Sequence, residues 1–328
     1  MPRASIVVPA YNSARTLPAT LDALLAQTYR DFEIVVVNDG STDGTAEVAR
    51  GYAADPRVRL VEQANRGLAG ARNTGIAAAS GEFVGFCDAD DLWKPTKLAA
   101  HVAHLDLSPD VGISFSGSEL IDEEGRRMGM AQTPRLWGVT AAHVFKRNPI
   151  GNGSAPVIRR AALDAIAYRP GFETKRDWVF DETFRQSEDI ECWLRIALTT
   201  DWQIEGVRGL LTCYRINGSG LSAHTDRQLA AWERVVSKLR PLNPAFFERH
   251  EATARAYQLR YLARRAVSAL DGDTAYGLVQ KAFEQSLRPF LEEPIKSTVT
   301  LCAAATLKIV GPAPLKRAAR LKMRTATR

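Results

Sequence analysis

Residues 34–45 decide the fold: they read Ile-Val-Val-Val-Asn-Asp-Gly-Ser-Thr-Asp-Gly-Thr. The apolar run is typical of a strand buried on both faces, and the polar residues after it predict a loop. Three more short runs predict strands: Ser5–Val8, Val58–Val61 and Phe83–Phe86. The segments between the four runs predict amphipathic helices: about 15–29, 43–54 and 67–79. This alternation predicts an α/β domain with a parallel sheet built from βαβ units.

Polar loops follow the predicted strands. They are Pro9–Asn12, Asn38–Ser41, Gln63–Gly67 and Asp88–Asp91. A single Asn or Asp after a strand is typical of a helix cap. In parallel sheets, however, ligands bind beyond the carboxyl ends of the strands. Several such loops at one edge therefore indicate a binding site.

Two of these loops carry carboxylates with two interpretations each. Asp88 and Asp90 can share a hard divalent cation that keeps positions for water and phosphate, or the cluster can be a turn before a helix. Asp39 can accept a hydrogen bond from a nucleobase N–H, or it can cap a helix. Neither a dinucleotide fingerprint nor a GK[ST] sequence occurs, which argues against dehydrogenases and NTPases.

Composition narrows the class of protein. The 328 residues are 45% hydrophobic and 24% charged, which excludes collagen-like and disordered chains. The longest apolar candidate, Ser297–Leu307, is shorter than the ~20 residues of a membrane-spanning helix. No charged-then-apolar leader follows Met1, and the four cysteines form no CxxC pair. We therefore expect a cytoplasmic protein without a disulfide framework.

The net charge of +6 is concentrated in a basic tail. Residues 295–328 hold eight Lys or Arg and no acidic residue, so residues 1–294 carry a net charge of −2. Nucleic acid is accordingly not an expected partner. The tail is either a solvated chain end, as is usual for termini, or a segment that attaches the protein peripherally to the anionic inner face of the membrane.

Five motifs in order resemble family 2 glycosyltransferases of the GT-A fold. They are Val8–Asn12, Asn38–Thr45, Asn65–Asn73, Asp88–Asp91 and Ser187–Asp189, the last followed by Trp193–Arg195. The resemblance covers about residues 4–222. It implies a Rossmann-like, mostly parallel central sheet over 1–222, and we expect a helical C-terminal region with the basic tail over 223–328.

The resemblance also implies inverting transfer of a sugar from a nucleotide donor. The donor-binding residues would be Pro9, Tyr11, Asp39, Asn65, Gly67, Arg72 and Asp88. Of these, Pro9, Tyr11 and Asp39 would hold the base and ribose, and Asn65, Gly67 and Arg72 would shape the loop beneath the nucleotide. Asp88 and Asp90 would hold Mn²⁺ or Mg²⁺ against the diphosphate.

Asp189 would be the base that deprotonates the acceptor hydroxyl, and the helix dipole would keep it ionised. Without the other motifs, the Glu188–Asp189 pair favours an ordinary acidic helix start. The family often has His where this chain has Asn217, a poor metal ligand that can still contact a diphosphate; His224 is a less favoured substitute.

The aromatic residues are less informative. Trp193 is expected in the core rather than against a sugar. Trp137 and Trp178 are candidates for the wall of an acceptor groove.

We predict a metal-dependent hexosyltransferase that uses a UDP-sugar. The acceptor would be a hydroxyl of a glycan or a lipid-linked glycan in bacterial surface polysaccharide or glycoconjugate assembly. One alternative is an inactive nucleotide-sugar-binding scaffold of a polysaccharide assembly complex. The other is a nucleotidyltransferase, whose Gly-rich start is missing here.

Overall fold

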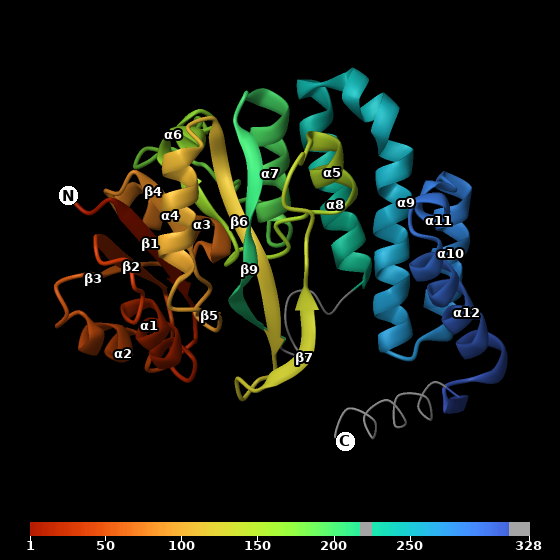
Figure 1. The fold of residues 1–328 in the computed structure, drawn as a ribbon, viewed down its shortest axis with the longest axis horizontal. Helices are drawn as coiled ribbons and strands as arrows, with labels where there is room; N and C mark the ends of the chain where they lie inside the picture. The colour runs from red at the N-terminus through yellow and green to blue at the C-terminus, as the bar shows by residue number, and fades with distance from the viewer. Residues whose placement is uncertain (217–224, 315–328) are drawn as a thin grey trace. The chain divides into compact units, whose positions relative to one another are not determined.

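The computed structural model describes residues 1–216 and 225–314, and Figure 1 shows its secondary structure. The chain divides into two compact units. The first comprises Met1–Val144 and Asn148–Leu221, and the second comprises Phe145–Arg147 and Ser222–Arg328.

A mixed sheet forms the centre of the first unit. Within the described residues its strands are β1 (Ala4–Ala10), β2 (Phe32–Asp39), β3 (Val58–Gln63), β4 (Phe83–Phe86), β5 (Leu92–Trp93), β6 (Val111–Ile121), β7 (Arg127–Gln132), β8 (Val157–Arg159) and β9 (Gln203–Arg215). Their order is β3-β2-β1-β4-β8-β6-β9-β5, and β7 pairs with β6. The pairings make β1, β2, β3, β4, β6 and β9 run in the same direction, so the predicted mostly parallel sheet is confirmed.

Helices of the first unit connect these strands. They are α1 (Leu17–Leu25), α2 (Thr45–Tyr52), α3 (Gly67–Ala78), α4 (Lys97–Leu107), α6 (Arg160–Asp164) and α7 (Glu188–Thr199); α5 (Ala141–Lys146) runs into the second unit. On one face of the sheet, Ile34 and Val36 pack in a core cluster with Leu21 of α1. On the other face, Val35 and Val37 pack with Ala71 of α3. Strand β2, to which residues 34–37 belong, is therefore buried on both faces, as its continuous apolar run predicts.

The segment Trp202–Tyr214 contains Gly206 and Gly209, which do not divide it into two strands. It forms one long strand, β9, which runs beside β6 (Figure 1). Gly209 has φ of +114°, a conformation that favours glycine. The register between β6 and β9 shifts around Gly117, so the irregularity is absorbed as a bulge and the pairing continues.

The second unit is helical in its described residues. Besides the end of α5, it contains α8 (Thr225–Leu239), the short 3₁₀ helix η2 (Arg240–Leu242), α9 (Pro244–Ser268), α10 (Gly272–Gln285), α11 (Arg288–Glu292) and α12 (Pro294–Val310). Leu262, Leu278 and Ala304 bring α9, α10 and α12 into one core cluster. Among the described residues, none of the helices is long and apolar enough to cross a membrane.

Candidate functional site

The loops after β1 and β2 lie together at the carboxyl edge of the sheet. Ala10 pairs with Asn38 at the ends of the two strands. The Asn12 side-chain oxygen accepts a hydrogen bond from the backbone N–H of Thr42 (2.8 Å), and the Asn12 N–H donates to the Ser41 hydroxyl (3.0 Å). Asn12 has φ of +48°, a backbone conformation that these two contacts hold in place. Pro9 is buried, whereas Tyr11 is 52% exposed.

The buried carboxylate of Asp39 ties the second loop to the start of α3. Oδ1 accepts from Gln63 Nε2 (2.6 Å) and from the backbone N–H of Arg66 (2.8 Å). Oδ2 accepts from the N–H of Gly67 at 2.9 Å. Asn65 donates to the Asp39 carbonyl. Asp39 thus accepts hydrogen bonds at the N-terminus of α3, which is a capping role. The capped helix begins 28 residues after Asp39 in the sequence.

The three aspartates after β4 differ in burial. Asp88 and Asp90 are partly exposed, whereas Asp91 is fully buried. Asp91 accepts from the Ser154 hydroxyl (2.6 Å) and from the backbone N–H of Arg215 (2.8 Å). Burial, followed by the charges of Asp90 and Asp88, raises the pKa of Asp91 well above its ordinary value. Asp91 is therefore a structural residue that holds the turn containing Asp88 and Asp90 in place.

Arg72 joins this turn to the start of α7. Its guanidinium donates to Asp88 Oδ1 (2.9 Å) and to Glu188 Oε1 (2.7 Å), and it lies over the Phe180 ring. Burial opposes its charge, but the nearby carboxylates outweigh burial and raise the pKa of Arg72. Arg72, expected to shape the loop beneath the nucleotide, lies in α3, and its guanidinium is among these acidic side chains.

Asp189 follows Glu188 in the first turn of α7 and is partly buried. Burial, followed by the charge of Glu188, raises the pKa of Asp189 to about 6, while Arg72 lowers it. The helix dipole was expected to keep Asp189 ionised; burial acts in the opposite direction and raises the pKa above the ordinary 3.8, yet the value stays below neutrality. A carboxylate with this pKa is mostly ionised at neutral pH and is a stronger base than an ordinary aspartate.

Asn73 is a structural residue that the motifs contain but the sequence did not single out. Its side-chain oxygen accepts from the backbone N–H groups of Val179 and Phe180, and its amide donates to the Phe180 carbonyl. These bonds position the segment that leads into α7. The sequence feature that could have pointed to Asn73 is its position next to Arg72 in the motif Asn65–Asn73.

The remaining candidates are placed as follows. Trp193 and Trp178 are buried, and Trp137 is exposed with Arg208 against its ring. Trp193 therefore packs in the core as expected, and Trp178 is too buried to line a groove. Asn217 and His224 lie outside the described residues. Within those residues, no group of three or more His, Cys, Asp or Glu is arranged to hold a metal ion.

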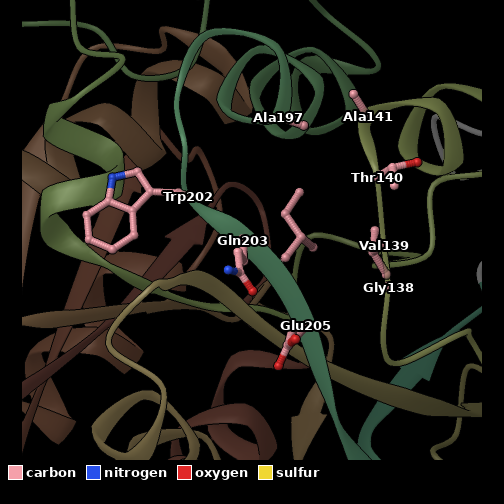
Figure 2. Close-up of a pocket in the computed structure, with 9 residues that line it drawn as sticks. Gly138, Val139, Thr140, Ala141, Ala197, Trp202, Gln203 and Glu205 are labelled. Carbon is pink, nitrogen blue, oxygen red and sulfur yellow. The ribbon is translucent and has the colours of Figure 1, made fainter.

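A separate pocket of about 260 Å³ lies elsewhere in the first unit. Gly138–Ala141, Ala197 and Trp202–Glu205 line it (Figure 2). Gln203 pairs with Val111, the first residue of β6, and β6 runs in the same direction as β4. The pocket is therefore near the amino ends of the strands, at the opposite edge from Asp88.

Comparisons with known proteins agree with this architecture. Residues 5–166 match the model described as "Glycosyl transferase family 2". The Escherichia coli UDP-Glc:alpha-D-GlcNAc-diphosphoundecaprenol beta-1,3-glucosyltransferase WfgD is 28% identical over 69% of this chain and 81% of its own length. Several curated relatives are matched over less than half of their length; a Nostoc relative, uncharacterized glycosyltransferase alr2836, is 41% identical over 40% of this chain and 42% of its own.

Two solved structures have a similar fold. Staphylococcus aureus TarS 1–349 in complex with UDP-GlcNAc has a TM-score of 0.60 at 19% identity, covering 93% of this chain and 91% of TarS 1–349. The mannosyltransferase PcManGT of Pyrobaculum calidifontis, in complex with GDP-Man and Mn²⁺, has a TM-score of 0.55 at 23% identity, covering 93% and 86%. With its family match, its relatives and this GT-A architecture, the chain belongs to glycosyl transferase family 2.

Proposed function

We propose that this protein is a metal-dependent, inverting glycosyltransferase. It moves a hexose-type sugar from a nucleotide-diphosphate donor to a hydroxyl of a glycan or lipid-linked glycan. The observation that carries the proposal is the Arg72 bridge between Asp88 and Glu188. The Arg72 guanidinium joins the carboxylate of Asp88, at the end of β4, to Glu188, the neighbour of Asp189. The proposed donor side and acceptor side would therefore meet at this guanidinium.

The nucleoside would bind at the ends of β1 and β2. Tyr11 offers an exposed ring beside the loop of Asp39, and Pro9 forms the rigid end of β1. An ionised carboxylate oxygen has about two acceptor sites. Asp39 Oδ2 accepts one backbone hydrogen bond from Gly67, which leaves capacity for a base N–H. Asn65 and Gly67 would then form the floor under the nucleotide.

Asp88 and Asp90 would hold Mn²⁺ or Mg²⁺. Their carboxylates are hard oxygen ligands, and Mg²⁺ in particular is commonly bound by one or two carboxylates together with substrate phosphates. The pair therefore fits the ion without a third acidic residue. When bound, the ion neutralises charge on the leaving diphosphate. Asn217 is the proposed additional contact to the diphosphate.

Asp189 would be the general base on the acceptor side. Its pKa of about 6 suits proton abstraction near neutral pH. Inverting displacement needs this base on the face of the sugar opposite the leaving group. Arg72 would act as a positioning residue that holds Glu188, and with it the first turn of α7, near Asp88.

UDP is the proposed nucleotide, and assembly of a bacterial surface polysaccharide or glycoconjugate is the proposed setting. TarS was solved with UDP-GlcNAc, and WfgD is named as a UDP-Glc-dependent enzyme with a diphosphoundecaprenol-linked acceptor. These properties belong to those proteins and support the proposal by similarity. We further propose that residues 1–222 form the catalytic domain, and that residues 223–328 attach it peripherally to the membrane through the basic tail.

The test is thermal stabilisation by nucleotides in the presence of Mn²⁺. UDP should raise the Tm because it binds the native state preferentially, and Asp88→Asn should remove most of the shift. Asp201→Asn, at an exposed position before β9, is the matched control and should keep it. If no nucleoside diphosphate shifts the wild-type Tm, the donor-site proposal is wrong. Binding without transfer to any acceptor in a panel would instead favour the inactive scaffold.

A further inference from the structure

The outer side of α12 is apolar. Its most exposed large side chains include Ile295 (79%), Val299 (63%) and Ile309 (81%), and Val310 and Cys302 are exposed as well. At 3.6 residues per turn these positions fall on one broad face, which we call the α12 stripe. The buried face of the same helix is formed by Ser297, Thr300, Ala304 and Leu307. The helix thus turns two small polar residues inward and its bulkiest β-branched apolar residues outward.

Such a stripe is unusual for a helix that borders water. Contiguous exposed apolar surface in a folded protein typically marks an interaction site. The inner face of α12 already packs in the core cluster of the second unit through Ala304. The stripe is therefore surplus to the packing of this unit and available to an external partner.

The charge around the stripe identifies the class of partner. Helix α12 contains Lys296 and Lys308 and no acidic residue. The sequence that follows, residues 311–328, adds six Lys or Arg and again no acid. A second copy of the chain would bring these like charges together, which opposes self-association. An anionic lipid surface satisfies both features, because it offers apolar chains beneath negative headgroups.

We infer that the α12 stripe enters the headgroup–acyl boundary of an anionic membrane, with the helix lying in the membrane plane. Lys296 borders the stripe, and its long side chain can reach the headgroups while its stem stays apolar. Lys308 lies on the α10 side of the helix, 3.7 Å from Asp273. The inference rests on the proposed peripheral attachment through the basic tail and deepens it by naming the inserting face. It also explains why the basic charge follows α12 directly.

Cys302 allows a direct test, because it lies on the stripe and is exposed, while Cys87 and Cys192 are buried. The full-length protein with Cys213→Ser is labelled at Cys302 with the environment-sensitive dye NBD. Phosphatidylcholine vesicles containing phosphatidylglycerol should raise the dye emission and shift it to shorter wavelength. Pure phosphatidylcholine vesicles should have a much smaller effect, and high salt should weaken the response.

The matched variants separate the stripe from the tail. Ile295→Ser combined with Val299→Ser should lower vesicle affinity by about tenfold, since two large aliphatic groups no longer leave water. Leu242→Ser alters an exposed apolar residue outside the stripe and should leave affinity unchanged. The Tm and the UDP–Mn²⁺ shift of each variant report on folding and donor binding, so failure of the enzymatic proposal would be seen separately.

Two results would overturn the inference. If the protein cosediments with anionic vesicles while the dye stays unchanged, the tail binds alone and the stripe stays in water. If the dye responds to rising protein concentration without vesicles, the stripe is a contact between copies of this chain.

Discussion

Arg72 Nη1 lies 2.7 Å from Oε1 of Glu188, although 115 residues separate the two in the sequence. Both side chains are almost fully buried. A buried ion pair contributes little over an apolar pair of the same shape, but removing one partner leaves an uncompensated charge. The pair therefore makes the geometry of the site depend on both residues, since it joins α3 to the first turn of α7, and Arg72 also holds Asp88 in the turn after β4.

Arg72→Met should destabilise the protein by about 3–5 kcal/mol, because Glu188 stays buried without its cation. The measurement is the free energy of unfolding from urea denaturation. Arg50→Met is the control: Arg50 also pairs with two carboxylates, Glu47 and Glu62, but at an exposed position. Its loss should cost far less stability, because exposed ion pairs contribute little. Equal losses for the two variants would contradict a buried, mutually dependent pair.

The aspartates after β4 should respond differently to substitution. Asp90→Asn should leave the Tm nearly unchanged and weaken UDP binding in the presence of Mn²⁺, because a metal ligand is lost. Asp91→Ala should lower stability by about 2–4 kcal/mol, since the Ser154 hydroxyl and the Arg215 N–H lose their buried acceptor. Calorimetry with UDP and Mn²⁺, together with thermal melts, measures both. A stable Asp91→Ala protein that cannot bind the metal would reverse these roles.

The different roles of Asp88, Asp90 and Asp91 show which features of the site a local sequence pattern does not predict. The motif predicts that carboxylates stand at the end of β4, because a strand run and the polar residues after it are local patterns. Which carboxylate turns inward depends on Ser154 and Arg215, which lie far away in the sequence. Likewise, the sequence indicated that α7 begins with acidic residues, but the burial that raises the pKa of Asp189 depends on tertiary packing.

The helices show the same limit. The acidic pair Glu188–Asp189 indicated the start of α7, and the C-terminal region was expected to be helical. The pattern does not show how these helices pack. It cannot tell which side of α12 faces the core, because small residues such as Ser297 and Ala304 pack as readily as larger ones when α9 and α10 lie close.

Lys97 should make stability depend on pH. It is fully buried, donates to the Ala155 carbonyl (2.6 Å) and the Thr212 hydroxyl (2.9 Å), and its pKa is lowered to about 7 by burial. The ordinary lysine pKa is 10.5, so between pH 7 and 10.5 the unfolded chain binds more protons than the folded one. Stability from this group therefore rises with pH across that window.

Lys97→Met should flatten that rise. The expected difference in slope is about 1 kcal/mol per pH unit between pH 7 and 9, from urea denaturation at several pH values. Lys94→Met, at a half-buried lysine paired with Glu119, is the control and should keep the wild-type slope. Identical slopes for Lys97→Met and wild type would mean that Lys97 stays charged in the folded protein.

Asp189→Asn should separate catalysis from donor binding. The amide keeps the size of the side chain but cannot take the acceptor's proton, so transfer should fall by about 10²–10⁴-fold while UDP affinity with Mn²⁺ stays nearly unchanged.

The wild-type rate should decline below about pH 6, as Asp189 becomes protonated. Because its folded pKa lies above the ordinary 3.8, the folded state holds the proton more tightly. Ionisation therefore costs stability as pH rises through this window, and the full cost is present above about pH 6.

In the metal-free protein, Asp189→Asn should consequently be more stable than wild type at pH 8, by about 1–2 kcal/mol after discounting for its partial exposure, and should lose that advantage at pH 4. Asp201→Asn, at an exposed site, should change neither rate nor stability. An Asp189→Asn protein with near wild-type transfer would exclude the base assignment, whatever its stability. A loss of UDP affinity as large as that of Asp90→Asn would place Asp189 at the metal instead, since a base on the acceptor side has no contact with the nucleotide.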